Sequence, residues 1–186
     1  MKKELDEALC RKYPKIFRDR HASMKTTLMC WGFDVGNGWY NIINALCHNI
    51  QSYIDAKRAA RAYALRYNRA LDRALNGDIA ALEKRYTLNG VISDWNRLRM
   101  QNDIANRKFR MVPEAPSQVV AVQVKEKFGG LRFYYDGGDE HISGMVTMAE
   151  SWAASTCEVC GNPGKYRGKQ WFYTACDEHT SEKDRE

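Results

Sequence analysis

The chain has 186 residues, enough for one domain of ordinary size with a small appendage. Hydrophobic residues make up 44% and charged residues 28%, which excludes a mainly disordered chain, a collagen-like chain and a coiled-coil rod. Lysine and arginine number 29 against 23 acidic residues, so the formal net charge is +6. This mild excess permits a nucleic acid or an acidic protein as partner without requiring either.

The N-terminal segment is patterned as a short helix followed by an apolar stretch. Leu5, Ala8 and Leu9 recur at helical spacing, and Pro14 follows closely, so a helix is expected before this proline. The first residues carry charges where a signal peptide needs an apolar run, and we therefore expect a cytoplasmic protein. The apolar stretch Thr27–Phe33 is too short for its periodicity to separate a strand from a buried loop.

The next part of the chain predicts a long helix and two shorter ones. After the break at 36–38, apolar residues recur in steps of three and four from Trp39 to Leu75, a stripe that Asn76-Gly77 should end. The uncharged run Val35–Ile54 contains several amides and a histidine, which favours an amphipathic helix over a membrane span. A short helix through Tyr86 and another over 92–109 should then complete an antiparallel helical hairpin.

The period changes after Pro113 and Pro116. Val120–Val124 and Leu131–Tyr135 alternate in a period of two around Gly129-Gly130, which predicts a β-hairpin, and 142–153 predicts an amphipathic helix. The expected fold class is α+β. Its expected domains are a helical body with a basic face (1–112), a β-hairpin with its helix (113–156) and a metal-binding module (157–186).

The C-terminal segment carries the strongest motif. Cys157-Glu-Val-Cys160 is followed, after fifteen residues, by Cys176-Asp-Glu-His179. Two cysteines three apart can point both sulfurs at one ion from a single tight turn, and three thiolates with one imidazole favour Zn²⁺ over Mg²⁺ or Ca²⁺. A hairpin around Gly168 between the pairs, with the second pair at the start of a last short helix, would make a treble-clef or zinc-ribbon-like module.

The ligand set predicts a structural ion and a protein that is not an enzyme. Four protein ligands leave no open position for a reactive water. The deaminase pattern needs a His-x-Glu element, whereas His141 directly follows Glu140, and residues 161–175 contain no histidine of the kind that treble-clef nucleases use. An enzymatic alternative would have to use Asp139, Glu140 and His141, which we instead expect to form a polar loop that caps the next helix.

The remaining cysteines and histidines have spacings that match no metal-ligand pattern. We expect the cysteines to be small buried groups, because cysteine without a partner behaves as a small hydrophobe. The residues concerned are Cys10, Cys30, Cys47, His21 and His48.

The middle of the chain is the basic part. Thirteen basic residues stand against five acidic ones between residues 57 and 110. On the long helix one broad face opposite the apolar stripe should carry Arg58, Arg61, Arg66, Arg69 and Arg73. Such a face can bind phosphate or carboxylate groups or can be an ordinary solvated surface, and the pattern leaves both open. The zinc hairpin adds Lys165, Arg167, Lys169 and Trp171, which suit phosphate contact and base stacking.

Five stretches together carry a family resemblance: 12–17, 30–33, 36–40, 124–135 and 157–161. They resemble a group of small proteins encoded by tailed bacteriophages and prophages, over most of the chain. The most specific part is the strand Lys127-Phe-Gly-Gly-Leu-Arg-Phe-Tyr134 followed by the Cys-x-x-Cys turn. The resemblance carries over no catalytic residue. It implies a binding protein in the bacterial host cytoplasm, acting as a stoichiometric inhibitor or modulator of a host defence or nucleic-acid-processing factor. The alternative is a small zinc regulator that binds nucleic acid directly.

Overall fold

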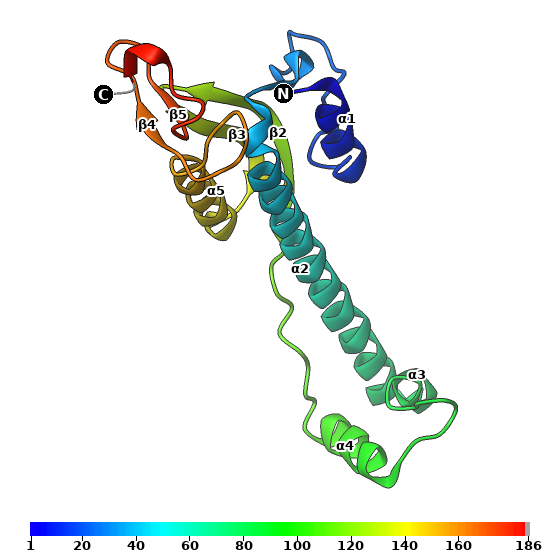
Figure 1. Ribbon diagram of the computed structural model, residues 1–186. Coiled ribbons are helices and arrows are strands. Elements are labelled where there is room, and N and C mark those ends of the chain that lie inside the picture. Colours follow the sequence, from blue (N-terminus) through cyan, green and yellow to red (C-terminus); the bar gives the residue numbers. More distant parts are fainter. Residues whose placement is uncertain (185–186) are drawn as a thin grey trace. The chain divides into compact units, whose positions relative to one another are not determined.

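The structure, a computed structural model, describes residues 1–184 and divides the chain into two compact units (Figure 1). The first consists of Met1–Ile54 and the chain from Pro116 onward, and the second is Asp55–Ala115. Helices and strands occur together, which confirms the α+β class. The grouping differs from the predicted segments 1–112, 113–156 and 157–186, because helix α2 (Tyr40–Leu75) supplies buried side chains to both units.

The first unit combines the N-terminal part of α2 with strands and two more helices. The short strand β1 (Phe33–Asp34) runs parallel to β2 (Ser117–Lys127), and β2 runs antiparallel to β3 (Gly130–Gly138). The apolar stretch Thr27–Phe33 forms a 3-10 turn over Met29–Trp31 that leads into β1. The two further helices are α1 (Lys3–Lys12) and α5 (Glu140–Ala153).

The core of this unit lies between α2 and the sheet. Trp39, in the 3-10 turn just before α2, and Ile43 and Ile50 of α2 are completely buried in one cluster with Val124 and Leu131 of the two long strands. Helices α1 and α5 add further buried apolar side chains to the same cluster. Because large aliphatic and aromatic side chains each remove substantial apolar area from water, this cluster is the main stabilising element of the unit.

The turn between β2 and β3 differs by one residue from the predicted Gly129-Gly130. Lys127 pairs with Gly130, so the two central residues are Phe128 and Gly129, with φ of 52° and 76°. Positive φ at both positions defines a tight turn that favours the right-handed strand twist. A phenylalanine at a positive φ is less stable than asparagine or glycine would be. The local sequence therefore did not indicate Phe128 as a turn residue.

The second unit has its own smaller core. The C-terminal half of α2 packs with α3 (Ile79–Glu83) and α4 (Asp94–Ala105) through a cluster that includes Tyr67, Leu71 and Leu82. Asp78 caps α3, its side chain accepting from the Ala81 amide.

The last helix of this unit stops before Phe109, where it was expected to end. Arg107 takes a positive φ of 48°, and the Lys108 amide closes the end by donating to the Asp103 carbonyl. From there the chain returns as an extended segment instead of a helix. Asn68 holds this segment through reciprocal bonds of 2.8 Å with the backbone N–H and C=O of Arg110.

A buried polar network fixes the packing in this core. The Tyr67 hydroxyl donates to the Asp103 carboxylate at 2.6 Å, and the Tyr86 hydroxyl donates to the same oxygen. Burial alone would raise the pKa of Asp103, but the two hydroxyl donors and the charges of Lys108 and Arg99 together outweigh it, and the pKa lies below its ordinary value. The network therefore favours a buried carboxylate that locks α4 onto α2 and the segment after α3.

The long helix is not a membrane span. No helix within residues 1–184 combines the length and the apolar character that a bilayer crossing requires.

Candidate metal centre and basic pocket

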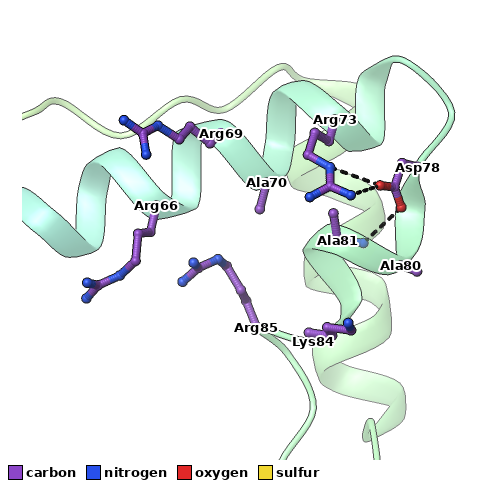
Figure 2. A pocket seen from close by; sticks show the side chains of 9 residues that line it. All are labelled: Arg66, Arg69, Ala70, Arg73, Asp78, Ala80, Ala81, Lys84 and Arg85. Atoms are coloured by element: carbon purple, nitrogen blue, oxygen red, sulfur yellow. Dashed lines mark hydrogen bonds and ion pairs between the residues drawn. The ribbon is translucent and has the colours of Figure 1, made fainter.

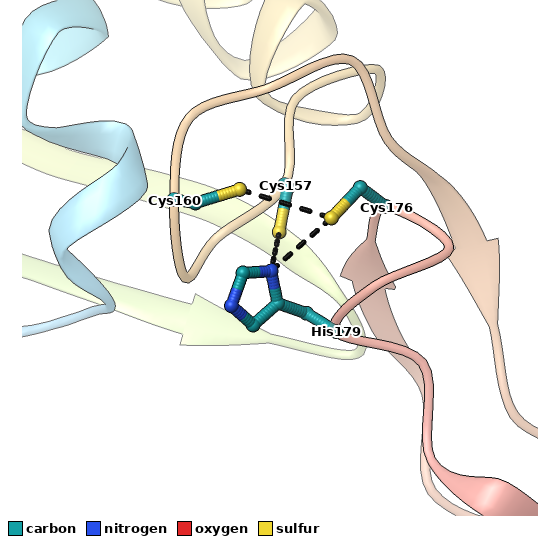
Figure 3. Close-up of side chains that lie close together, drawn as sticks. All are labelled: Cys157, Cys160, Cys176 and His179. Carbon is teal, nitrogen blue, oxygen red and sulfur yellow. Dashed lines mark hydrogen bonds between the residues drawn. The ribbon is translucent and has the colours of Figure 1, made fainter.

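The four predicted ligands come together at one point of the first unit (Figure 3). Cys157 and Cys160 lie on a tight turn just after α5, and Cys176 and His179 lie on a second turn after strand β5 (Tyr173–Ala175). The Cys160 and Cys176 sulfurs are 3.7 Å apart, and Nδ1 of His179 lies 3.1 Å from the Cys176 sulfur and 3.8 Å from that of Cys157. All four ligand atoms lie within 4.8 Å of one another.

These separations suit a single small ion. Sulfurs bound at about 2.3 Å to a tetrahedral ion lie about 3.8 Å from each other, close to the observed spacing. The Cys157 side chain is buried, whereas Cys160 is exposed. Burial opposes ionisation of the Cys157 thiol, but backbone amides around it, including those of Cys176 and Cys160, lower its pKa to about 7. The cluster could therefore hold a metal ion with sulfur in its thiolate form.

The chain between the ligand pairs forms the predicted hairpin. Strand β4 (Lys165–Arg167) pairs antiparallel with β5 (Tyr173–Ala175), and Gly168 takes a φ of 91° at the loop between them. The predicted last helix is absent at the second ligand pair. Cys176–His179 instead forms one turn, closed by the His179 amide on the Cys176 carbonyl. A 3-10 turn over Glu182–Asp184 follows it.

The metal centre is joined to the start of α2 rather than being a separate appendage. The Gly36 amide donates to the Glu158 carboxylate and the Gly38 amide to the Glu158 carbonyl, each at 2.7 Å. The indole N–H of the fully buried Trp39 donates to the Thr156 carbonyl at 2.8 Å. A Cβ on Gly38 would stand 2.1 Å from the Cys157 carbonyl oxygen, so only glycine permits this approach. The glycine-rich segment before α2 therefore serves as a seat for the ligand turn.

A second candidate site lies in the Asp55–Ala115 unit (Figure 2). The C-terminal half of α2 and the short α3 enclose a pocket of about 310 Å³, here called the basic pocket. Its charged lining consists of Arg66, Arg69, Arg73, Lys84, Arg85 and Asp78.

One cation of this pocket is neutralised within the fold. Arg73 turns to Asp78, with which it forms an ion pair (Figure 2). Within residues 1–184, no ion pair is found for Arg66, Arg69, Lys84 or Arg85. Arg66 and Arg85 project into the same space from the two sides of the pocket (Figure 2). The pocket therefore concentrates positive charge that the protein itself leaves uncompensated.

The predicted arginine face is divided by the structure. Arg66, Arg69 and Arg73 meet in the basic pocket, but Arg61 donates to the Pro113 carbonyl at 3.0 Å and Arg58 lies outside the pocket lining. The helical pattern of the sequence did not predict Lys84 and Arg85 as part of this site, because their position depends on how the chain turns after Gly77. The Asp78 cap was the one local signal that could have brought them to α2.

The basic residues of the β4–β5 hairpin are arranged unequally. Arg167 is largely buried and forms an ion pair with Asp177, to which the Lys165 ammonium also comes within 4.0 Å. Trp171 is 79% exposed and Lys169 is exposed beside it. Lys165, Lys169 and Trp171 are therefore exposed to a partner, whereas Arg167 is held within the fold.

The other cysteines and the acidic loop take part in packing, hydrogen bonding and helix capping. Burial and the neighbouring Asp6 raise the pKa of the Cys10 thiol to about 12, and the thiol donates to Asp6, which Arg20 also binds. Cys47 is completely buried in the core, as expected, whereas Cys10 and Cys30 are only half-buried, contrary to the expectation. Asp139 caps α5 by accepting from the Ile142 amide, which confirms the capping prediction.

Comparison of the chain with protein-family models, with curated proteins and with solved structures finds no match.

Proposed function

We propose that the protein is a non-enzymatic binding protein of a tailed bacteriophage, held in shape by a structural zinc ion and attached to an acidic host protein through its basic pocket. The host protein would be a defence or nucleic-acid-processing factor that the phage protein inhibits or modulates. The observation that carries this proposal is the cluster of uncompensated cations around the basic pocket.

The zinc assignment rests on the chemistry of the ligands. Three thiolates and one imidazole form the donor set that Zn²⁺ prefers, and four protein ligands complete a tetrahedral shell. The bonds from Gly36 and Gly38 to Glu158 tie this shell to the helix that runs through both units. The ion's contribution would thus be to folding, on the order of 10 kcal/mol by comparison with other structural zinc sites.

The partner assignment rests on electrostatics. Like charges held together by folded helices repel one another, and an anion that enters between them relieves this cost. Guanidinium groups bind carboxylates through two parallel hydrogen bonds, which gives arginine clusters a preference for planar anions. A concave pocket of about 310 Å³ accepts the ends of a few acidic side chains from a protruding loop of a partner protein.

The test is capture of the host protein with charge-matched variants. Arg66→Glu with Arg85→Glu reverses two pocket cations, whereas Lys25→Glu with Arg97→Glu reverses two exposed cations elsewhere. Both variants lose the same charge, so a difference between them reports on the pocket. We expect a nuclease-treated host lysate to yield the same partner with the native chain and the control, and none with the pocket variant. Equal capture by the pocket variant would reject this role of the pocket, and capture that needs intact nucleic acid would favour the alternative function.

A further inference from the structure

Two exposed aromatic rings of the first unit, Phe128 and Trp171, lie where the β2–β3 turn meets the β4–β5 hairpin. A pocket of about 430 Å³, here called the aromatic notch, is lined by Glu126, Lys127, Phe128, Gln170, Trp171 and Phe172. Trp171 is 79% exposed and Phe128 is 69% exposed, so neither ring is packed in the core. Behind the notch, the Tyr166 and Phe172 rings stack at a centroid distance of 5.1 Å.

The two sides of the notch are fixed to each other. The Thr174 hydroxyl donates to the Gly129 carbonyl at 2.6 Å, which binds the turn to strand β5. A Cβ on Gly129 would stand 2.7 Å from the Tyr166 ring, so the turn packs closely against β4 as well. The rings of the notch are therefore presented by a preformed and metal-supported surface.

Phe128 has a backbone conformation that is unfavourable for phenylalanine. Its φ of 52° lies in the left-handed region, where a bulky side chain is strained and where asparagine is the favoured residue in this type of turn. The strain is not offset by burial, because the ring is mostly exposed. Backbone strain of this kind concentrates at functional sites. The exposed ring at this strained position therefore indicates contact with a ligand.

The chemistry around the rings identifies the ligand class. The Lys127 ammonium lies 5.5 Å from the centroid of the Phe128 ring, and Lys169 precedes Gln170 and Trp171 in the zinc hairpin loop. Glu126 is occupied by the amide of Gly129, to which its carboxylate is hydrogen-bonded. Exposed aromatic faces beside lysines are the arrangement that stacks unpaired bases and contacts the phosphates between them.

We propose that the aromatic notch binds unpaired bases of a single-stranded nucleic acid, with Phe128 and Trp171 as stacking platforms. This inference goes beyond the proposed protein partner and does not rest on the basic pocket, because the two sites use different residues in different units. A duplex should bind more weakly than a single strand, since its bases are already stacked.

The decisive variant is Phe128→Asn, which should move stability and binding in opposite directions. Asparagine relieves the turn strain, so the urea midpoint of the metal-loaded protein should rise, while affinity for a short fluorescein-labelled oligothymidylate should fall about tenfold in anisotropy titrations at low salt. Trp171→Ala should weaken binding similarly, and Trp95→Ala, which removes a tryptophan that is 65% exposed in the other unit, should not.

Four results would overturn the proposal. The first is no binding of the oligonucleotide by the native chain at low salt. The second is unchanged affinity in both Phe128→Asn and Trp171→Ala. The third is a Phe128→Asn variant less stable than the native chain, since the ring would then be needed for the fold. If binding occurs and is lost in the pocket variant Arg66→Glu/Arg85→Glu instead, the nucleic acid occupies the basic pocket and the notch is not its site.

Discussion

Replacing Gly38 by alanine tests how the metal centre is joined to the rest of the first unit. The added Cβ would lie 2.1 Å from the Cys157 carbonyl oxygen, 2.5 Å from the Gly161 nitrogen and 2.8 Å from the Glu158 carbonyl carbon. All three are backbone atoms of the ligand turn, so no side-chain rotation can relieve the overlap. Gly38 does not have a positive φ, and the effect of alanine is therefore steric rather than conformational.

The size of the effect follows from the hydrogen bonds that hold this contact. Separation of the two segments would remove the bonds from Gly36 and Gly38 to Glu158 and from Trp39 to Thr156. The two bonds to carbonyl groups contribute about 1 kcal/mol each and the bond to the carboxylate about 1.5–3 kcal/mol. We therefore expect Gly38→Ala to lower the free energy of unfolding by about 3.5–5 kcal/mol and to weaken zinc binding.

The assay is urea unfolding followed by circular dichroism, together with competition for zinc against a chromophoric chelator. Gly144→Ala is the matched control, because a Cβ there meets nothing within 4 Å and the position lies inside α5. Alanine at an exposed helical position should stabilise the protein by about 0.5–1 kcal/mol. If Gly38→Ala is as stable as the native chain and holds zinc equally well, the ligand turn is not seated on the start of α2.

Three further changes test the metal centre, the buried carboxylate and a helix cap. Cys176→Ser should abolish stoichiometric zinc binding and lower the melting temperature of the first unit, whereas chelation of the native protein should reproduce the same loss in calorimetry. The pKa of Asp103 is lower in the folded chain than its ordinary value of 3.8, so its contribution to stability is present above that pH and is lost as the pH falls through the folded-state pKa. Asp103→Asn should therefore destabilise the protein at neutral pH and flatten the acid limb of its stability profile; an unchanged acid limb would assign that limb to other carboxylates. Asp139→Ala removes the N-cap of α5 and should cost about 1 kcal/mol in urea unfolding, and a cost near zero would show that the cap is not needed.

The features that sequence predicted are those set by local pattern. The stripe from Trp39 to Leu75 and the stop at Asn76-Gly77 place α2 almost to the residue, because helical periodicity and left-handed end residues act over a few positions. The clustering of Cys157, Cys160, Cys176 and His179 was also predictable, since the two Cys-x-x-Cys/His pairs restrict the backbone to tight turns. The capping aspartates at 78 and 139 belong to the same class of short-range signal.

The features that sequence missed depend on contacts distant in the chain. Phe128 occupies a turn position that local preference assigns to glycine or asparagine. The turn therefore lies at Phe128-Gly129, one residue before the predicted Gly129-Gly130. The basic pocket needs Lys84 and Arg85 to fold back against α2, which no helical wheel of α2 alone can show. The contact of Gly38 with Cys157 joins residues more than a hundred positions apart, so the division at residue 112 could not anticipate it.

Zinc K-edge X-ray absorption of the purified native protein tests the central claim most directly. A closed ligand set made by Cys157, Cys160, Cys176 and His179 predicts one zinc per chain, with three sulfur neighbours at about 2.3 Å and one nitrogen neighbour at about 2.0–2.1 Å. Protein without a bound transition metal, or a spectrum that requires a water oxygen in place of one of these four ligands, would contradict it.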